Sequence, residues 1–484
     1  MNLKYHGPSK PLRVAFVHPD LGIGGAERLV VDAAVGLQRL GHDVNLYTSY
    51  HDPGHCFEET KDGTLKIHHV VPPFPRSLGG KFHILLAHLR QLHLTLRLLL
   101  WDAPEHDVYF VDQLSTCVPF LRLLGQTRVV FYCHFPDKLL ANGAFVEGNL
   151  VRNKAGLLKR LYRLPMDWWE EITTNSLKGQ ADVILANSRF TGRIFKSYFP
   201  SIKQIPQVVY PGINISAYET EVDDFDSDIL AITSPRPSLI SLNRFEEKKN
   251  AQLALESFAL LIQNAPRFNG LRLVLAGGYD ERLPDNVRTL DTLVARAKSL
   301  SLSYNIISPV ALPPPAAALT TFATDPQILF LLNFTTSQRT ALLLGPSTLA
   351  LLYTPANEHF GIVPVEAMTC GVPVLACDSG GPTESVVASP PAARTGWLEK
   401  PDGATWARAL LEIVSLSPIE RVQISERAKA RARTLFGMDA MARDLDGALQ
   451  KAVSMGKVDF LGGYGAILLM FTGFLLAYFV GPFI

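Results

Sequence analysis

The feature that most constrains the fold is a regular alternation of short apolar runs with segments of helix length. In the first half of the chain the runs are "RVAFVHP", "DVNLYTS", "VYFVDQ", "RVVFYCH", "DVILANS" and "QVVYPG". A second series follows, with "PSLISLNRF", "LRLVLAGG", "LALLYTP" and "PVLACDS". Such a pattern is typical of parallel sheets with helices on both faces. The sequence therefore predicts an α/β protein with two doubly wound, Rossmann-like domains, and an interdomain cleft where strand ends meet a ligand.

The length also indicates two domains, because 484 residues exceed the roughly 100–200 residues of an ordinary domain. The acidic segment "NISAYETEVDDFDSDIL" interrupts the alternation and is the expected linker. We expect an N-terminal domain over 1–212, a linker over 213–235, and a C-terminal domain with a trailing helix over 236–457. Residues 458–484 form a separate hydrophobic segment.

Charge and cysteine content exclude several classes of protein. A net charge of +1 provides no general attraction for nucleic acid, so we expect no nucleic-acid partner. The five cysteines are odd in number and scattered, without the paired spacing of a zinc site or a disulfide framework. A reducing compartment fits this pattern.

The hydrophobic segment at the C-terminus predicts a membrane anchor. From Phe460 to Ile484 it carries no charged residue, and it is long enough to cross a hydrocarbon core of about 30 Å. It is apolar on every face, unlike a helix that packs on a soluble domain. Arg443, Lys451 and Lys457 precede it and no Lys or Arg follows, which predicts that the preceding domains are cytosolic. The N-terminus lacks the apolar core of a signal peptide.

A glycine-rich turn, "GIGGAER", connects the first expected strand to a helix. Gly24 and Gly25 would let the backbone approach a phosphate, and the helix would offer its free N–H groups and the positive end of its dipole. A tight turn without any ligand explains the pattern equally well. The dinucleotide fingerprint fails, because Glu27 stands where its last glycine should be, and Arg28 and Leu29 follow.

The second domain carries two cations at a strand end, in "SLNRFEEKKN". Arg244 and Lys249 come directly before an amphipathic helical pattern, where two fixed cations could clamp a diphosphate. For either residue taken singly, a solvated basic face is the alternative.

The stretch "NEHFGIVPVEAM" predicts a helix that begins near Ile362, since Pro364 is tolerated in a first helical turn. This start leaves the backbone N–H groups of Gly361, Ile362 and Val363 without helical partners and available to an anion. A phosphate or diphosphate is the expected anion.

Two glutamates flank this helix start and are expected to do different work. Glu366, in the first turn, can accept hydrogen bonds from a ribose diol, and Glu358, in the loop, can reach the hydroxyls of a bound sugar. Each alone is an ordinary surface residue. Together with the two cations, Gly361 and the second glycine turn "DSGGPTESV", they indicate a nucleotide-sugar site.

These residues resemble the retaining glycosyltransferases of family 4, which have the GT-B fold. The family signature E-x-F-G-x-x-x-x-E matches at Glu358, Phe360, Gly361 and Glu366, and the "GGAER" and "CGVPVLACDSGGPTE" blocks match as well. The likeness covers about Arg13 to Arg433.

More narrowly, "YCHFPD", "NFTTSQRTALL" and "LLYTPANEHFGIVPVEAM" resemble the mannosyltransferases that add α-1,3 and α-1,6 branches during dolichol-linked oligosaccharide assembly. The resemblance implies GDP-mannose as donor and a mannosylated chitobiosyl diphosphodolichol as acceptor. It also implies a location in the endoplasmic reticulum membrane, with the catalytic domains on the cytosolic face. The expected partners are this lipid-linked oligosaccharide, the membrane and other enzymes of the same pathway.

The sequence departs from the family pattern in one region. Between Ser301 and Gly345 it holds a Pro/Ala-rich insertion, which we expect to be a surface loop, and Leu332 stands where the family usually has a glycine.

The resemblance implies retention at the anomeric carbon, with the departing diphosphate helping to deprotonate the acceptor. Arg244 and Lys249 would then act most strongly in the transition state. His134 maps to a family position near the donor sugar, and with Glu358 it is a candidate catalytic residue; a structural histidine is the alternative. The D-x-D spacing in Asp223–Asp228 lies in the acidic linker, so we expect no catalytic metal and no cofactor.

The segment Phe82–Trp101 places leucines on one helical face and arginines on another. It predicts either a helix in the membrane interface or one that packs on the core. The segment "VRNKAGLLKRLYRLPMDWWEE" also has two interpretations, as a contact with anionic lipid headgroups or as a solvated helix.

Two other functions fit the same pattern. One is another membrane-bound GT-B transferase, such as a UDP-N-acetylglucosamine-dependent enzyme acting on a phosphoinositide. The other is a noncatalytic membrane scaffold, against which stands the presence of Glu358, Glu366, Arg244 and Lys249 together.

Overall fold

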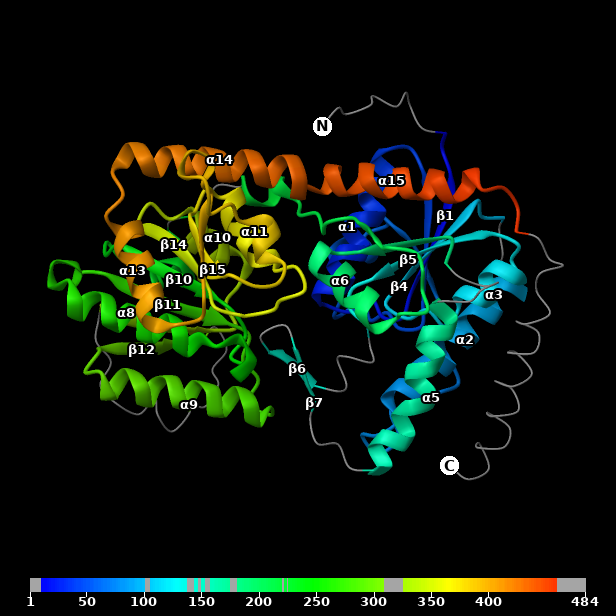
Figure 1. The fold of residues 1–484 in the computed structure, drawn as a ribbon, viewed down its shortest axis with the longest axis horizontal. Helices are drawn as coiled ribbons and strands as arrows, with labels where there is room; N and C mark the ends of the chain where they lie inside the picture. The colour runs from blue at the N-terminus through cyan, green and yellow to red at the C-terminus, as the bar shows by residue number, and fades with distance from the viewer. Residues whose placement is uncertain are drawn as a thin grey trace. The chain divides into compact units, whose positions relative to one another are not determined.

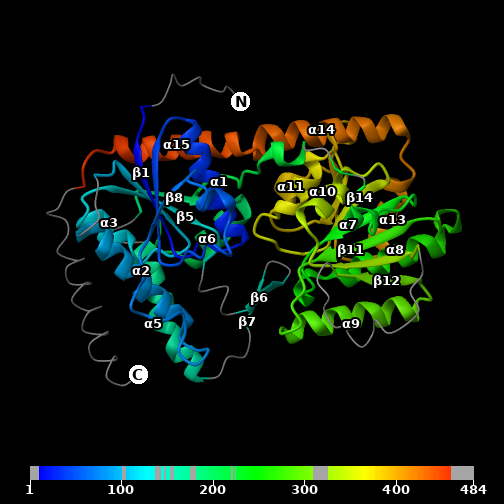
Figure 2. The same ribbon diagram turned by 180° about the vertical axis from the view of Figure 1, so that it is seen from behind.

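The computed structural model describes residues 10–100, 105–136, 143–146, 149–152, 157–174, 181–219, 222–223, 225–308 and 325–458. The chain divides into an N-terminal unit, Met1–Gly212 with Met438–Ile484, and a C-terminal unit, Ile213–Gly437. Each unit contains a seven-stranded sheet with helices on both faces (Figure 1 and Figure 2). This arrangement confirms the prediction of two Rossmann-like units.

The sheet of the N-terminal unit has the order β3-β2-β1-β4-β5-β8-β9, and all neighbouring strands are parallel. Its strands are β1 (Arg13–His18), β2 (Asp43–Thr48), β3 (Lys66–His69), β4 (Val108–Asp112), β5 (Arg128–Cys133), β8 (Val183–Ala186) and β9 (Gln207–Val208). Its helices are α1 (Gly25–Arg39), α2 (His83–Leu100), α3 (Val118–Leu123), α5 (Leu157–Thr174) and α6 (Arg189–Tyr198). A separate antiparallel pair joins β6 (Gly143–Val146) and β7 (Asn149–Arg152).

Strand β1 explains why the apolar runs of this unit are uninterrupted. Val14 and Phe16 belong to one hydrophobic cluster, which includes residues of α1, whereas Ala15 and Val17 belong to another, which includes residues of α2 and α3. Because successive side chains of a strand point to opposite faces, both faces of the sheet are buried.

The helix α15 (Met438–Ser454) corrects the expected domain boundary. We assigned this trailing helix to the C-terminal domain, but it belongs to the N-terminal unit. The physical reason is its apolar stripe, in which Met441, Leu445 and Leu449 join the hydrophobic cluster formed by β1 and α1. Figure 1 and Figure 2 both show α15 lying along α1 and the N-terminal sheet.

The contact between α1 and α15 depends on Gly36, because a Cβ atom there would lie 2.8 Å from the Cβ atom of Ala442. Gly36→Val is therefore expected to lower the free energy of unfolding by about 1–3 kcal/mol through overpacking. The matched control is Gly447→Ala on α15, where a Cβ atom meets nothing within 4 Å. Thermal or urea unfolding should show this control unchanged or slightly stabilised. Equal stability of the two variants would contradict a close helix contact at Gly36.

The sheet of the C-terminal unit has the order β12-β13-β11-β10-β14-β15-β16, again with all neighbours parallel. Its strands are β10 (Ser238–Leu242), β11 (Arg272–Gly277), β12 (Tyr304–Ile307), β13 (Ile328–Leu332), β14 (Thr348–Tyr353), β15 (Val374–Cys377) and β16 (Gly396–Glu399). Its helices are α7 (Ser227–Leu230), α8 (Ala251–Asn264), α9 (Pro284–Ser299), α10 (Thr336–Leu344), α11 (Ile362–Thr369), α12 (Pro382–Ser385), α13 (Gly403–Val414) and α14 (Pro418–Phe436).

The expected linker, residues 213–235, belongs to the C-terminal unit and packs on it. Tyr218 is buried, and Gln338 of α10 donates a hydrogen bond to the carbonyl oxygen of Asp228 (3.1 Å). Asp226 caps α7 by accepting a hydrogen bond from the backbone N–H of Asp228 (2.8 Å). The segment is therefore part of the C-terminal unit and not a separate linker, although Phe225 and Leu230 stay exposed.

The Pro/Ala-rich insertion mostly falls on residues 309–324, which lie outside the described residues. Leu332, the residue that replaces the usual glycine, ends β13 and is buried in the hydrophobic core of the C-terminal unit. Its backbone pairs with Gly277 at the end of β11. Leu332 therefore lies at a strand end in the core and not in a surface loop.

Among the described helices none has both the length and the apolar character needed to cross a bilayer. The expected anchor, Phe460–Ile484, lies outside the described residues. Helix α2 buries Leu86, Leu94 and Leu98, a different stripe from the one that the leucine spacing suggested, and the backbone N–H of Leu85 donates to the Tyr162 hydroxyl of α5 (3.2 Å). These contacts favour the core-packing interpretation of α2.

Candidate functional site

The C-terminal unit brings Lys249 and Glu358 into direct contact. Lys249 ends a short 3-10 helix that follows β10, and Glu358 lies in the loop after β14. The ammonium Nζ of Lys249 lies 2.5 Å from Glu358 Oε1, and the backbone carbonyl of Lys249 accepts a hydrogen bond from the Thr354 hydroxyl (2.6 Å). These contacts fix the Lys249–Glu358 pair in place. Because both side chains are partly exposed, a ligand can still reach the pair.

Helix α11 begins at Ile362, as the position of Pro364 predicted. Gly361 precedes it with φ = +82°, a left-handed conformation that favours glycine, and the Tyr353 ring packs against it. The first-turn N–H groups of such a helix lack intrahelical partners, so Gly361, Ile362 and Val363 present backbone donors to an anion. They stay predicted donor-binding residues.

The second glycine turn has a structural role that the sequence did not indicate. A Cβ atom at Gly381 would lie 2.2 Å from the carbonyl oxygen of Phe360, so a side chain there would collide with the Glu358 loop. The backbone N–H of Gly381 instead donates to the carbonyl oxygen of Glu358 (2.8 Å), and Asn357 N–H donates to the Ser379 hydroxyl (3.0 Å). The turn therefore supports the loop that carries Glu358.

Glu366 is buried in the second turn of α11, not in the first as expected, and its Oε1 atom already has two partners. The Tyr218 hydroxyl donates to it at 2.5 Å and Arg339 Nη1 donates at 2.9 Å. Burial and the neighbouring carboxylate raise the pKa of Tyr218, which keeps its hydroxyl a donor. A ribose diol would have to bind the remaining oxygen, Oε2. Tyr218 and Arg339 were not found from the sequence, although Arg339 stands in the quoted "NFTTSQRTALL" block.

Glu366→Ala is expected to weaken GDP binding and also to lower the free energy of unfolding by about 1–3 kcal/mol, because it leaves Tyr218 and Arg339 without their acceptor. Isothermal titration with GDP, at a temperature where the variant is folded, separates the two effects. Glu366→Gln keeps an acceptor oxygen and is the matched control. An unchanged melting temperature for the alanine variant would contradict the structural role of Glu366.

Arg244 lies at the exit of β10 with its side chain 70% exposed, so it is free of the core. Its Nη1 atom lies 3.3 Å from Glu246, which also pairs with Lys248 at 3.1 Å. The structure thus places Arg244 and Lys249 in one loop but gives them different surroundings. Lys249 is fixed by Glu358, whereas Arg244 is on the surface and able to turn toward a ligand.

The glycine turn of the N-terminal unit leads into α1 as predicted, with Gly24 before the helix and Gly25 at its start. Gly24 has an extended backbone that any residue adopts, and a Cβ atom at Gly25 would meet nothing within 4 Å. The three atoms nearest to a Cβ at Gly24 all belong to the flexible Glu27 side chain. The fold itself therefore requires neither glycine, and their assignment as donor-binding residues stays a prediction.

His134 takes part in a cluster of three residues at the carboxyl ends of adjacent strands. His18 ends β1, Asp112 ends β4, and His134 follows β5. Asp112 lies between the two rings, with Oδ1 2.6 Å from His134 Nε2 and Oδ2 2.8 Å from His18 Nδ1. His18 and Asp112 are buried, whereas His134 keeps part of its ring exposed. Asn187 Nδ2 donates to the carbonyl oxygen of His134 (3.0 Å), which fixes its backbone.

The electrostatics of this cluster favour a charged pair. Burial by itself would raise the pKa of Asp112, but His134 and His18 together lower it to about 2. Burial would likewise lower the pKa of His134, yet the Asp112 carboxylate raises it above the ordinary value. A partly exposed, protonatable imidazole at a strand end is suited to donate hydrogen bonds to a sugar or a developing negative charge.

The expected absence of a metal stays a prediction. Within the described ranges no group of three or more His, Cys, Asp or Glu side chains could hold an ion. In the acidic D-x-D segment, Asp223 accepts a hydrogen bond from the Phe225 N–H (3.0 Å), and Asp226 caps α7. Both side chains thus have local structural roles.

Similar solved structures define the class of the fold. Sucrose-phosphate synthase from Thermosynechococcus elongatus has a TM-score of 0.65 at 16% identity, covering 92% of this chain and 100% of that chain. The catalytic domain of starch synthase IV from Arabidopsis thaliana has a TM-score of 0.64 at 14% identity, covering 92% and 100%. Two such units with polar clusters at their strand ends define a protein with the GT-B fold of glycosyltransferases.

The sequence comparisons define the family. Models described as Glycosyltransferase Family 4 and Glycosyl transferases group 1 match residues 23–217 and 326–431. The α-1,3/1,6-mannosyltransferase ALG2 of Rhizomucor pusillus is 44% identical over 471 residues, 95% of this chain and 97% of that protein. The ALG2 protein of Saccharomyces cerevisiae is 39% identical, over 91% of this chain and 85% of that protein. This chain belongs to the ALG2 family of α-1,3/1,6-mannosyltransferases.

Proposed function

We propose that the protein transfers mannose from GDP-mannose to a mannosylated chitobiosyl diphosphodolichol, forming α-1,3 and α-1,6 branches with retention at the anomeric carbon. Membership of the ALG2 family supports the linkages and the role in N-glycan precursor assembly. The observation that carries a nucleotide-sugar site is the 2.5 Å contact between Lys249 and Glu358 beside the start of α11.

Each residue of this site has a role in the proposed reaction. Lys249, Arg244 and the N–H groups that open α11 bind the diphosphate, and Glu358 accepts hydrogen bonds from the mannose hydroxyls. The bond from the anomeric carbon to the diphosphate oxygen breaks, while the acceptor oxygen bonds to that carbon on the same face. The acceptor proton passes to an oxygen of the departing diphosphate. Lys249 stabilises the charge that grows on that oxygen, and we propose that His134 donates a hydrogen bond to the sugar.

A donor screen on the full chain in detergent tests this proposal. GDP at 100 times its dissociation constant should stabilise the fold by about 2.7 kcal/mol, seen as a raised melting temperature, and UDP should not. Radiolabelled mannose should pass from GDP-mannose to a short-chain lipid acceptor. Stabilisation by UDP, with N-acetylglucosamine transferred to a phosphoinositide, would establish the alternative transferase. Binding of neither nucleotide would favour the noncatalytic scaffold.

We also propose that the reaction needs no catalytic metal. Arg244, Lys249 and the positive end of α11 supply charge that a divalent ion would otherwise provide. Transfer of mannose should therefore persist in excess EDTA. Loss of activity that manganese restores would overturn this proposal.

For location, we propose the endoplasmic reticulum membrane, with both units on the cytosolic face and residues 460–484 as the anchor. The uncharged run of 25 residues supports the anchor. Deleting it should release the protein in a carbonate wash, while transfer to a soluble acceptor analogue continues. A truncated protein that stays fully membrane-bound would shift the main attachment to another segment. Other enzymes of the pathway are proposed partners at this membrane.

A further inference from the structure

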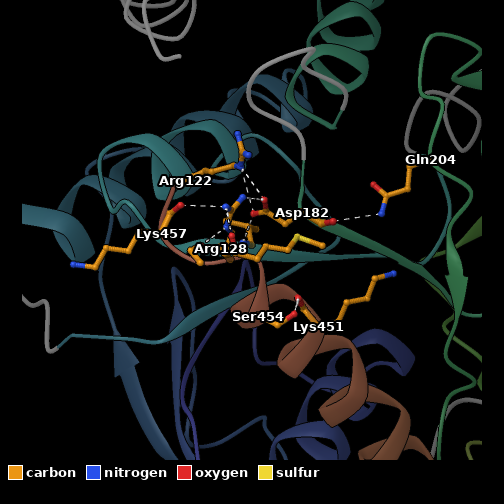
Figure 3. A network of polar contacts seen from close by, with 10 residues as sticks. Arg122, Arg128, Asp182, Gln204, Lys451, Ser454 and Lys457 are labelled. Atoms are coloured by element: carbon orange, nitrogen blue, oxygen red, sulfur yellow. Dashed lines mark hydrogen bonds and ion pairs between the residues drawn. The ribbon is translucent and has the colours of Figure 1, made fainter. Parts of the chain in front are cut away.

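The end of α15 is held by one arginine from the N-terminal sheet (Figure 3). Arg128 Nε donates to the carbonyl oxygen of Gly456 (2.7 Å), and Nη2 donates to the carbonyl oxygens of Met455 (2.9 Å) and Lys457 (3.1 Å). Carbonyl groups at the end of a helix have no intrahelical partners, so a cation there satisfies them. Arg128 therefore fixes the path of the chain directly after α15.

A buried carboxylate connects this contact to the rest of the unit. Asp182 pairs with Arg128 (2.6 Å) and Arg122 (3.2 Å), and it accepts a hydrogen bond from the Val129 N–H (2.9 Å). Gln204 donates to the Asp182 carbonyl oxygen (3.4 Å). Figure 3 shows these groups meeting at the amino ends of β5 and β8. The amino edge of the sheet and the end of α15 thus form one fixed surface.

Exposed apolar side chains lie close along the chain to members of this network. Leu124, Ile205 and Met455 are all exposed, and each lies within two residues of a network member. Ile205, at 75% exposure, comes directly after Gln204. A single exposed apolar residue is ordinary, but several of them beside one polar network are typical of an interaction surface.

Three lysines lie within a few residues of Ile205 and Met455 along the chain. Lys203, Lys451 and Lys457 are exposed, and no described residue forms an ion pair with their ammonium groups. Figure 3 shows the ammonium ends of Lys451 and Lys457 directed away from the Arg128–Asp182 pair. The carboxylate of Asp182 is buried and neutralised by its two arginines. The surface therefore presents apolar groups together with positive charge, which complements an anionic lipid headgroup layer.

The course of the chain points to the same occupant. The uncharged run Phe460–Ile484 begins three residues after Lys457, and three extended residues reach only about 10 Å. We propose that Leu124, Ile205 and Met455, with Lys203, Lys451 and Lys457, form a lipid-contact surface that seats the N-terminal unit on an anionic bilayer. This inference rests on the proposed function at a membrane-bound acceptor.

The lipid-contact surface and the histidine cluster lie at opposite edges of one sheet. Arg128 begins β5, whereas His134 follows its end. A strand of six residues is about 20 Å long, so a bilayer in contact with the surface would lie roughly that far from the His18–Asp112–His134 cluster.

Lipid quenching on the full chain, reconstituted into vesicles with anionic lipid, tests the surface. An environment-sensitive fluorophore is attached at Ile205→Cys, in a background where the partly exposed Cys56 and Cys370 are replaced by serine. The matched control is Val71→Cys, which is 73% exposed and follows β3 at the other edge of the same sheet. Brominated lipids should quench the label at 205 several-fold more than the label at 71. The double variant Lys203→Glu, Lys457→Glu should reduce the quenching at 205.

Equal quenching at the two positions would overturn the lipid-contact surface. The surface would also be overturned if the label at 205 became shielded from water only when another protein of the pathway was added. Such a result would mark a protein interface. Mannose transfer to a soluble acceptor is measured on the same preparations. Transfer without selective quenching overturns only the surface, and selective quenching without transfer overturns only the proposed function.

Discussion

Lys249→Ala is expected to lower the turnover number about 10²–10³-fold with a smaller change in KM. The reason is that charge on the leaving diphosphate oxygen grows in the transition state, so a cation at that oxygen contributes more there than in the bound substrate. Steady-state kinetics with GDP-mannose, together with GDP affinity, separate the two contributions. The 2.5 Å contact with Glu358 holds the ammonium group in place before substrate binds.

The matched control for this prediction is Lys248→Ala. Lys248 is the neighbouring residue in the same short helix, but its exposed ammonium group pairs with Glu246 (3.1 Å) and not with Glu358. Its loss should change turnover less than a few-fold, as for an ordinary surface ion pair. Equal and small effects from the two alanine variants would contradict the assignment of Lys249.

Asp112→Asn is expected to lower turnover about 10²-fold and to shift the pH profile. An uncharged amide cannot stabilise the imidazolium form, so the pKa of His134 should fall from its raised value. As pH rises, the variant should therefore lose its activity at a lower pH than the unchanged protein does. The 10²-fold loss is the magnitude typical of a misplaced catalytic group. Asp112 would act as a positioning residue, because it contacts His134 (2.6 Å) and is itself buried.

The same carboxylate makes stability depend on pH at two ends of the scale. The pKa of Asp112 is lowered to about 2, so its contribution to stability is present above its unfolded value of 3.8 and is lost as pH falls toward 2. The pKa of His134 is raised above 6.5, so its contribution is full below 6.5 and is lost as pH rises through the raised value. Urea unfolding from pH 5 to 8 should therefore show a decline that is absent in Asp112→Asn.

Asp107→Asn provides the matched control for Asp112→Asn. Asp107 comes directly before β4, the strand that Asp112 ends, but it pairs with Arg13 on the surface (2.9 Å). Its replacement should leave the pH profile of turnover unchanged. Identical profiles for Asp112→Asn and the unchanged protein would contradict the proposed action of Asp112 on His134.

The sequence predicted the local features of the molecule well. Apolar runs predicted ten of the fourteen described strands of the two sheets but not β3, β12, β13 and β16, and Pro364 predicted the start of α11 at Ile362. Both inferences depend on residues that are close along the chain. The local rules of backbone geometry and hydrophobic periodicity therefore sufficed.

Features that depend on distant residues were not predicted. Glu366 receives its hydrogen bonds from Tyr218 and Arg339, 148 and 27 positions away. His18 and Asp112 meet because β1 and β4 are neighbours in the sheet, although two other strands separate them along the chain. A single sequence shows which residues end strands but not the order of the strands. The contact that orients His134 could therefore be seen only in the folded structure.

The assignment of α15 shows the same limit at the level of a whole unit. The segment Met438–Ser454 has a clear amphipathic pattern, with an apolar stripe along one side. Nothing in that pattern distinguishes the core of one sheet from the core of the other. The stripe packs beside α1, where Gly36 allows the close approach of Ala442.

The return of α15 also determines the order in which the units can fold during synthesis. The C-terminal unit, Ile213–Gly437, is continuous, and its two ends are already paired through the Ile213 N–H and the Phe436 carbonyl oxygen (2.9 Å). The N-terminal unit, in contrast, completes its core only when Met441, Leu445 and Leu449 have left the ribosome. Domains usually fold in the order of their synthesis. Here the N-terminal unit begins synthesis first but cannot complete its core until the C-terminal unit has been synthesised. During that interval part of the apolar surface of the N-terminal unit stays exposed to chaperones.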